Sequence, residues 1–436
     1  MENNQETPSA LERRIDMAVS MADVEKDVEA RIKRMARSMK MAGFRPGKVP
    51  LKIVEQTHGA QVRSEAIGAA VEKAFGEKVR EQELRIAGQP SIEPGDATED
   101  GKLSFTAVFE VYPEVQPGSL ADSSFERPTL EIGDAEVEKT IEVLRKQRTQ
   151  YEVTDRAAQD QDRVVIDFIG RKDGEVFEGG QASDFPFVLG AGAMLKDFEE
   201  AVAGLSQGES KTFEMTFPED YQAEHLAGQK VEFEITVKAV EAPKLPEVDS
   251  DFAKELGVKG GDVAQLREEI KGNLEREVKR RAQARVKEQV MEALLETTTI
   301  ELPKALVQAE SEVLADNARR DMESRGMDVK DLPIQAEWFV EQAERRVRLG
   351  LIMAEIVKAN DLYATPEQVR SMIEEMAESY EDPSELVGWY YSDQQRLAQV
   401  EALVVENNVV EWALKEGKTE DKPVGFDDLM GNEAAA

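Results

Sequence analysis

Residues Arg31–Lys52 read RIKRMARSMKMAGFRPGKVPLK and contain eight Lys or Arg residues but no Asp or Glu. The 436-residue chain as a whole carries a net charge of −34 at pH 7. A basic island in an acidic chain indicates the partner of that region rather than its fold. We therefore expect this basic segment to bind something anionic. Its positive residues are Arg31, Lys33, Arg34, Arg37, Lys40, Arg45, Lys48 and Lys52.

The centre of the basic segment, residues 43–50 with the sequence GFRPGKVP, predicts a tight loop between two helices. Gly43 suits the left-handed stop of the first helix, and Gly47 permits a second reversal of the chain. Pro46 and Pro50 fix the backbone at two further points, and proline is favoured in the first turn of a helix. The loop is therefore expected to be stiff.

This stiff loop is expected to present Phe44, Arg45 and Lys48 outward. A rigid tip loses little entropy when it docks, and an aromatic residue beside an arginine is typical of an interface hot spot. For a lone G-x-x-G-K pattern, a solvated helix–helix turn with incidental charge is the default interpretation. The uninterrupted positive charge around the pattern favours a docking loop instead.

The pattern Gly-Phe-Arg-x-Gly-Lys-x-Pro, near the end of a first helical hairpin, resembles the ribosome-docking signature of bacterial trigger factors. In that family the loop contacts ribosomal protein and ribosomal RNA beside the polypeptide exit. Pro46 occupies the family's variable position. The residues that the resemblance assigns to ribosome binding are Gly43, Phe44, Arg45, Gly47, Lys48 and Pro50.

The composition excludes several kinds of site. Because the sequence has no Cys, it offers no disulfide, Cys-zinc centre or thiol nucleophile. The two histidines, His58 and His225, lie far apart in the sequence, which argues against a His-based metal site or a Ser-His-Asp triad. The N-terminus has no apolar signal-like core, and no run of about 18 apolar residues occurs. We expect a cytoplasmic protein with no cofactor, no metal and no membrane contact.

The length suggests about two to four domains, each large enough for its own core. Residues 9–21 alternate apolar and polar residues as a strand does, and the following apolar residues recur at helical spacing. After the loop a second helix is predicted, interrupted near residues 58–59, and then strands at residues 84–92 and 102–112. Residues 1–112 thus predict an α+β domain in which a sheet covers one side of a helical hairpin, with the basic loop at its tip.

Residues 113–149 are proline-rich at first and then helical, which predicts a linker. Residues 150–241 change to short β segments punctuated by Gly and Pro, with one short helix at residues 194–203. Aromatic residues gather in this region. Any single one of them could simply be a buried core residue, so packing in the hydrophobic core is the default interpretation for each. They are Phe168, Phe177, Phe185, Phe187, Phe198, Phe213, Phe217, Tyr221 and Phe233.

The order of these aromatic residues resembles that of FKBP-type peptidyl-prolyl isomerases. Glu178 stands where that family usually has Asp, and Phe198 where it commonly has Trp; both changes keep the pocket apolar. The family's pattern also implies two hydrogen-bond donors, the Leu195 backbone N–H and the Tyr221 hydroxyl. The site residues implied by the resemblance are Phe168, Phe177, Glu178, Phe185, Met194, Leu195, Phe198, Tyr221 and Phe233.

An aromatic pocket fits the chemistry of prolyl isomerisation. Rotation about a peptide bond faces a barrier of roughly 18–20 kcal/mol that arises from amide resonance. No bond is cut and no proton has to move, so a catalytic acid, base or metal is not required. A dry aromatic cup disfavours the charge-separated resonance form, and a donor to the twisted carbonyl helps further. We therefore expect X-Pro peptides as substrates.

Residues 242–416 read as almost entirely helical. Apolar residues at three- and four-residue spacing from Val263 to Leu294 predict one helix of about 35 residues, beyond the roughly 8–20 residues of ordinary globular helices. A plain bundle with buried stripes and an open cradle with adaptable methionines both fit this pattern. The polar tail, residues 417–436, is expected to be disordered. Further helices are predicted at residues 303–325, 334–360, 366–380 and 392–416.

The sequence thus predicts a multidomain α+β protein with a ribosome-binding α+β domain, an FKBP-like β-rich domain and an elongated all-α C-terminal domain with arms. The resemblances imply a ribosome-associated chaperone that holds nascent or unfolded polypeptides open, assists their folding and export, and isomerises X-Pro bonds. Open apolar surfaces would also allow a weak homodimer away from the ribosome. Two alternatives remain open: mainly an isomerase with substrate-recruiting helical flanks, or a non-catalytic acidic scaffold or RNA-associated module.

Overall fold

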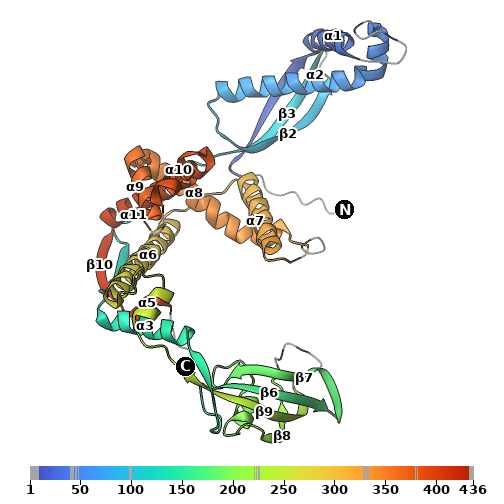
Figure 1. The fold of residues 1–436 in the computed structure, drawn as a ribbon. Helices are drawn as coiled ribbons and strands as arrows, with labels where there is room; N and C mark the ends of the chain where they lie inside the picture. The colour runs from blue at the N-terminus through green and yellow to red at the C-terminus, as the bar shows by residue number, and fades with distance from the viewer. Residues whose placement is uncertain are drawn as a thin grey trace. The chain divides into compact units, whose positions relative to one another are not determined.

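The chain folds into two compact units, seen in a computed structural model (Figure 1). One unit consists of residues 1–128 and 283–422, and the other of residues 129–282 and 423–436. All-helical and sheet-containing parts both occur, which confirms the predicted multidomain α+β class. The structure describes residues 9–39, 44, 47, 49–97, 101–219, 221, 223, 226–327, 329, 333–378, 380 and 382–431.

The N-terminal part of the first unit packs two helices against a three-stranded antiparallel sheet of order β1-β3-β2. Alternation in β1 buries Ile15, Met17 and Val19, while α1 buries residues at helical spacing against the same core. The predicted strand and helices are therefore confirmed. The elements are β1 (Glu12–Ser20), α1 (Met21–Ser38), α2 (Leu51–Glu81), β2 (Ile86–Ala97) and β3 (Lys102–Val111).

Three boundaries in this part differ from the prediction. Helix α2 continues through Gly59, because the buried residues Val54 and Val62 on either side outweigh the roughly 1 kcal/mol that a helical glycine costs. Helix α1 ends at Ser38, before the expected stop at Gly43, which lies outside the described residues. Strand β2 runs to Ala97, beyond the predicted end at residue 92, because residues 93–97 also pair with β3.

The helical part of the chain contains the predicted long helix, α6 (Val263–Thr297), which is 35 residues long. The four other predicted helices are present with shifted ends, and the helix predicted at residues 366–380 stops at Ala377. Two short helices were not predicted: α5, capped by Asp249, and α10, capped by Asp382. The elements besides α6 are α5 (Ser250–Glu255), α7 (Lys304–Ser324), η1 (Ala336–Phe339), α8 (Val340–Asn360), α9 (Pro366–Ala377), α10 (Pro383–Tyr391) and α11 (Gln394–Glu416).

The expectation of a disordered tail is wrong for residues 418–430. Strand β10 (Lys418–Pro423) pairs with β4 (Ser124–Thr129), which lies in the predicted linker. Ion pairs between Arg127 and Asp421 at 2.6 Å, and between Lys422 and Glu126 at 2.8 Å, accompany this pairing. Strand β10 is exposed along its whole length, and β4 buries only Phe125 and Pro128, which are three residues apart. Neither strand therefore shows the two-residue apolar alternation that predicts a strand.

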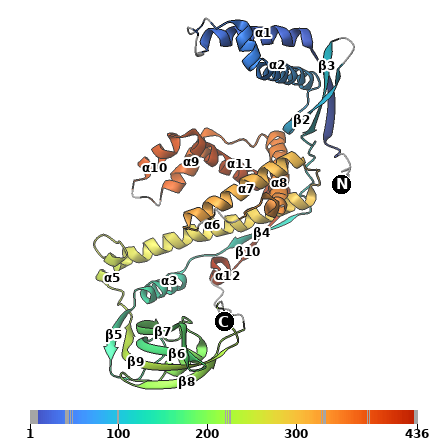
Figure 2. The same cartoon turned by 90° about the vertical axis from the view of Figure 1, so that its right-hand side faces the viewer.

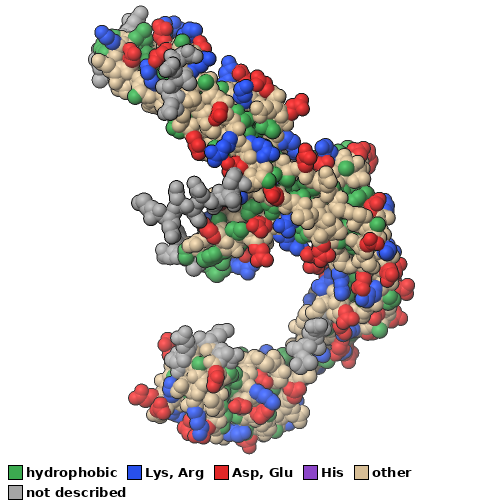
Figure 3. Space-filling model, turned by 180° about the vertical axis from the view of Figure 1, so that it is seen from behind, with side chains coloured by type: hydrophobic (Ala, Val, Ile, Leu, Met, Phe, Trp, Pro, Cys, Tyr) green, Lys and Arg blue, Asp and Glu red, His purple; other side chains and the backbone are tan. Residues whose placement is uncertain are grey.

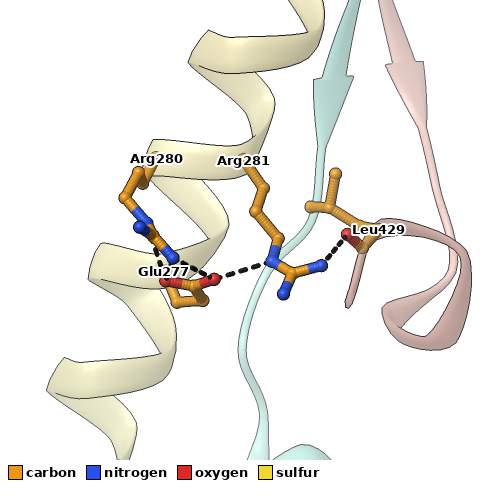
Figure 4. A network of polar contacts seen from close by, with 4 residues as sticks. All are labelled: Glu277, Arg280, Arg281 and Leu429. Carbon is orange, nitrogen blue, oxygen red and sulfur yellow. Dashed lines mark hydrogen bonds and ion pairs between the residues drawn. The ribbon is translucent and has the colours of Figure 1, made fainter. Parts of the chain in front are cut away.

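The last helix of the chain, α12 (Phe426–Met430), buries Leu429 in a core shared with α6. Arg281 of α6 donates a hydrogen bond to the Leu429 carbonyl oxygen at 3.2 Å (Figure 4). Glu277 accepts hydrogen bonds from Arg280 and from Arg281, and these bonds hold the pKa of its carboxyl below its ordinary value. The polar network therefore fixes the end of the described chain to α6.

The second unit contains a five-stranded antiparallel sheet of order β5-β9-β6-β7, with β8 also paired to β9 (Figure 2). Its inward residues and α4 form one aromatic-rich core. Strand β7 runs without a break from Glu175 to Val188, so it is longer than the short β segments expected in residues 150–241. The elements are α3 (Asp134–Gln147), β5 (Gln150–Thr154), β6 (Arg163–Lys172), β7 (Glu175–Val188), α4 (Lys196–Val202), β8 (Ser210–Thr216) and β9 (Lys230–Lys244).

Candidate functional site

A pocket of about 400 Å³ opens in the sheet-containing domain of the second unit. Eight of the nine residues predicted for an isomerase site line it, from β6, β7, β9, α4 and the segments beside them. Phe185 is the exception, because it packs edge-on behind Phe168 at a centroid distance of 5.8 Å. The predicted residues that line the pocket are Phe168, Phe177, Glu178, Met194, Leu195, Phe198, Tyr221 and Phe233.

Phe198 forms the floor of this aromatic pocket and is 1% exposed. Its ring meets Phe168 at 5.7 Å and 83°, and Phe233 at 5.3 Å and 88°. These edge-to-face contacts each stabilise by about 0.5–1.5 kcal/mol beyond area burial. Phe177 meets Phe233 in the same way, at 5.9 Å and 89°. The rings therefore hold one another in fixed orientations.

Two glycines let the pocket rings lie directly on the strands. A Cβ atom on Gly170 of β6 would lie 2.6 Å from a ring carbon of Phe233 and 2.8 Å from one of Phe177. A Cβ on Gly180 of β7 would lie 2.9 Å from the Phe177 ring. Contacts that short do not occur between real carbon atoms, so the absence of side chains at these positions shapes the pocket wall.

The polar groups of the pocket are few. Leu195 is the N-cap residue of α4, and none of the groups in the described ranges accepts a hydrogen bond from its N–H. The Tyr221 ring is 37% exposed and lies 4.5 Å from the Phe217 ring. Glu178 is exposed at the rim. The pocket can thus hold an apolar ring and offer donors to a carbonyl beside it.

Several lining residues were not predicted as site residues. Met215 and Phe217 reach the pocket from the end of β8 and are buried. Their two-residue spacing along β8 places them on one face, a signal that the sequence did contain. The further lining residues are Gly179, Gly192, Ala193, Ala223 and Leu226. Within the described ranges, no group of three or more His, Asp or Glu side chains could hold a metal ion.

The second predicted site, the basic loop, is only partly described. Phe44 is 38% exposed, as expected of a docking aromatic. Gly47 has φ +77°, which confirms a reversal there, and a Cβ on it would lie 3.1 Å from the Arg37 carbonyl oxygen. Val49 is buried in the domain core, and Pro50 is the N-cap residue of α2. The predicted residues outside the described ranges are Gly43, Arg45 and Lys48.

Not all of the positive charge of the basic segment is free. Arg31 pairs with Asp27 at 2.6 Å, and Lys33 pairs with Glu29 at 2.6 Å, each one helical turn apart. For Arg34, Arg37 and Lys52, no described carboxylate lies within ion-pairing distance. The charge available to a partner is therefore concentrated toward the end of α1 and the start of α2. Elsewhere, acidic and basic side chains intermingle on the face drawn in Figure 3.

Comparisons with known proteins cover nearly the whole chain. The family described as "Bacterial trigger factor protein (TF)" matches residues 1–144, and the family described as its C-terminus matches residues 262–415. The family "FKBP-type peptidyl-prolyl cis-trans isomerase" matches residues 154–238. The isomerase match contains every residue of the aromatic pocket.

Two similar relatives are proteins named trigger factor. The one from Aromatoleum aromaticum is 68% identical over 434 residues, covering 100% of both chains. The one from Azoarcus sp. is 68% identical over 430 residues, covering 99% of this chain and 98% of its own. A solved trigger factor chaperone structure covers 95% of this chain and 100% of its own at 16% identity, with a TM-score of 0.46. In the described part of the chain, no helix is long and apolar enough to cross a membrane.

Proposed function

The chain belongs to the bacterial trigger factor family, and from this premise we propose which of its residues bind the ribosome and which isomerise X-Pro bonds. It is a ribosome-associated chaperone that carries an FKBP-type peptidyl-prolyl isomerase domain. The domains we propose are residues 1–112 for ribosome binding, 113–149 as linker, 150–241 for isomerisation and 242–416 for client binding.

The isomerase site is the aromatic pocket around Phe198. A prolyl ring enters the cup formed by Phe168, Phe177, Phe198, Phe233 and Tyr221, where water is displaced from the peptide bond. In that dry setting the charge-separated amide resonance form is disfavoured, so the barrier to rotation falls. The edge-to-face contacts of Phe198 are the observation that supports this assignment best, because they keep the cup preformed.

The Leu195 N–H is the proposed donor to the carbonyl oxygen of the twisted bond. As an N-cap amide of α4, it is one of the groups that a helix leaves without an internal partner. The Tyr221 hydroxyl is the second proposed donor, and its exposure lets it reach a bound peptide. A donor already aimed at the twisted carbonyl stabilises the transition state more than the planar ground state. Phe185 supports Phe168 from behind and has no contact with substrate in this proposal.

The basic loop is the proposed ribosome anchor, through ribosomal protein and ribosomal RNA near the polypeptide exit. Its residues are Gly43, Phe44, Arg45, Gly47, Lys48 and Pro50. The rest of the chain is strongly acidic and would be repelled by RNA phosphates, so only the basic segment is suited to contact them. The buried Val49 and the close approach of Gly47 to Arg37 support a loop of defined shape.

The proposed clients are nascent or unfolded polypeptides in the cytoplasm, held by apolar surface of the helical domain. Exposed large side chains there, including Tyr363 and Leu403, support this assignment. The same surface would let two copies associate weakly when no ribosome is present, and sedimentation equilibrium of the purified chain tests this. A concentration-independent monomer mass would remove the dimer from the proposal.

Two variants of the intact chain test the two sites separately. Phe44→Ala is expected to reduce co-sedimentation with ribosomes by about tenfold while turnover of a short X-Pro peptide stays unchanged. Tyr221→Ala is expected to reduce that turnover by about tenfold while co-sedimentation stays unchanged. A loop variant that still co-sediments fully, or a pocket variant with full turnover, contradicts the corresponding assignment.

A further inference from the structure

An aromatic groove lies where α9 meets α10, in the first unit, whereas the isomerase pocket belongs to the second unit. Tyr380, Trp389 and Tyr390 line a depression of about 740 Å³ together with Leu386. Tyr380 is 59% exposed and Trp389 is 49% exposed, although large aromatic side chains are normally covered. The Trp389 and Tyr390 rings stand at 82° with centroids 5.1 Å apart, so two ring faces meet at a corner.

The Trp389 ring is held in place from one side. The Arg396 guanidinium lies 3.9 Å from the ring centroid, and the same side chain donates a hydrogen bond to the Trp389 carbonyl oxygen at 2.7 Å. This cation–π contact shows that the ring already accommodates one positive group. It also fixes the indole without covering it, because the residue stays half exposed. The groove is therefore preformed.

The polar tips of the groove are hydrogen-bond donors that have no acceptor among the described residues. Neither the Trp389 indole N–H nor the hydroxyls of Tyr380 and Tyr390 donate to any group within the described residues. A polyproline II segment makes no internal hydrogen bonds, so its carbonyl oxygens are free to accept from such donors. Grooves lined by aromatic rings are the surfaces on which proline-rich segments dock. A helical client would offer satisfied carbonyls and match the groove less well.

The rim of the groove is negatively charged. Asp382 and Glu385 both line it, and no described cation pairs with either carboxylate. The Ser384 hydroxyl donates to Asp382 at 2.5 Å, and this bond holds the pKa of that carboxyl below its ordinary value. Asp382 therefore stays ionised at neutral pH. The charge complements a segment that carries Lys or Arg and repels an acidic one.

We propose that this groove binds proline-rich segments flanked by Lys or Arg, in the polyproline II conformation, as a site distinct from the isomerase pocket. Prolyl rings pack into the corner between Trp389 and Tyr390. Backbone carbonyls of the segment accept from the indole and phenol groups. A flanking cation lies against Asp382 and Glu385. Binding needs no isomerisation, so it is independent of turnover in the pocket.

The test uses the intact chain and a fluorescein-labelled peptide of two arginines followed by eight prolines, with affinity measured by fluorescence anisotropy. All proteins carry Tyr221→Ala, which weakens binding at the isomerase pocket. Trp389→Ala is expected to weaken the affinity at least tenfold. The matched control is Trp338→Ala, which removes another exposed tryptophan outside the groove and is expected to change the affinity less than twofold. Circular dichroism verifies that both variants keep their helices.

A second variant keeps the ring and changes only the charge. Glu385→Lys is expected to weaken binding of the arginine-flanked peptide about fivefold at low salt, and less at high salt. A peptide with the prolines replaced by alternating glycine and serine is expected to bind at least tenfold more weakly. Equal binding of the two peptides, or a Trp389 variant that binds like the Trp338 control, overturns the proposal. Failure of the isomerase assignment would appear separately, as full turnover by Tyr221→Ala in the absence of the labelled peptide.

Discussion

Gly170 lies in β6 against two rings of the aromatic pocket, and replacing it with alanine should slow prolyl isomerisation. The added methyl group would lie 2.6 Å from Phe233 and 2.8 Å from Phe177, about 1 Å inside the ordinary contact distance between carbon atoms. Phe233 cannot retreat, because Phe198 and Phe168 pack against it. The rings must therefore tilt into the pocket.

The expected magnitude follows from the energetics of overpacking. One extra methyl group in a filled core costs about 1–3 kcal/mol of stability. If displacement of the rings raises the activation free energy by about 1.4 kcal/mol of that total, kcat/KM falls about tenfold. We therefore expect Gly170→Ala to lower kcat/KM for a short X-Pro peptide by about tenfold, with the domain still folded.

The assay is turnover of that peptide by the intact chain, with thermal unfolding followed in parallel. Repeating the substitution in a Phe177→Leu background supplies the internal control, because the smaller side chain makes room for the methyl group. The loss caused by Gly170→Ala should then be smaller than in the wild-type background. Wild-type turnover in the Gly170 variant, or an equal loss in both backgrounds, would refute the geometry on which the pocket assignment rests.

Three further predictions follow from other parts of the structure. Gly68→Ala, at an exposed position of α2 with open space around it, should raise the stability of the N-terminal domain by about 0.5–1 kcal/mol in urea unfolding and leave turnover unchanged. Asp162→Ala should lower the stability of the isomerase domain by about 1.5–3 kcal/mol, because this buried carboxylate accepts two bonds from Arg156 and one from the Gln159 N–H. Glu277→Gln should lower the urea midpoint at neutral pH. Because the pKa of Glu277 is depressed, its contribution is present above the unfolded-state value and is lost as pH falls through the folded-state value, so the variant and wild type should converge in acid.

The aromatic pocket was largely predictable because its residues carry two signals at once. Phe233 lies between two glutamates on a strand, as alternation predicts for an inward residue, and the family resemblance orders the aromatic residues along the chain. What sequence alone could not decide is which side of the domain core each ring faces. Phe185, which the resemblance places in the site, packs against Phe168 and does not line the pocket. Phe217, for which packing is the default interpretation, does line it.

The tail was mispredicted for a different reason. Strand β10 is polar, and its partner β4 lies almost 300 residues earlier, as the 294-residue separation of Arg127 and Asp421 shows. Strand β10 buries none of its residues, and β4 buries only Phe125 and Pro128, so neither has the alternating apolar pattern of a strand. The pairing is accompanied by ion pairs that composition does not display. The predicted interruption of α2 has a local cause. Glycine has a low helix propensity, so Gly59 predicts a break, but burial of Val54 and Val62 on either side stabilises a continuous helix.

The central claim is that the basic loop binds an otherwise acidic chaperone to the ribosome beside the polypeptide exit. The most direct measurement places a photo-crosslinking residue at position 44 and irradiates the intact chain with ribosomes that carry a nascent chain. Crosslinks to ribosomal protein or RNA near the exit are expected from position 44, and none from position 143, an exposed site on α3. Equal crosslinking from the two positions, or none from position 44, would contradict the account.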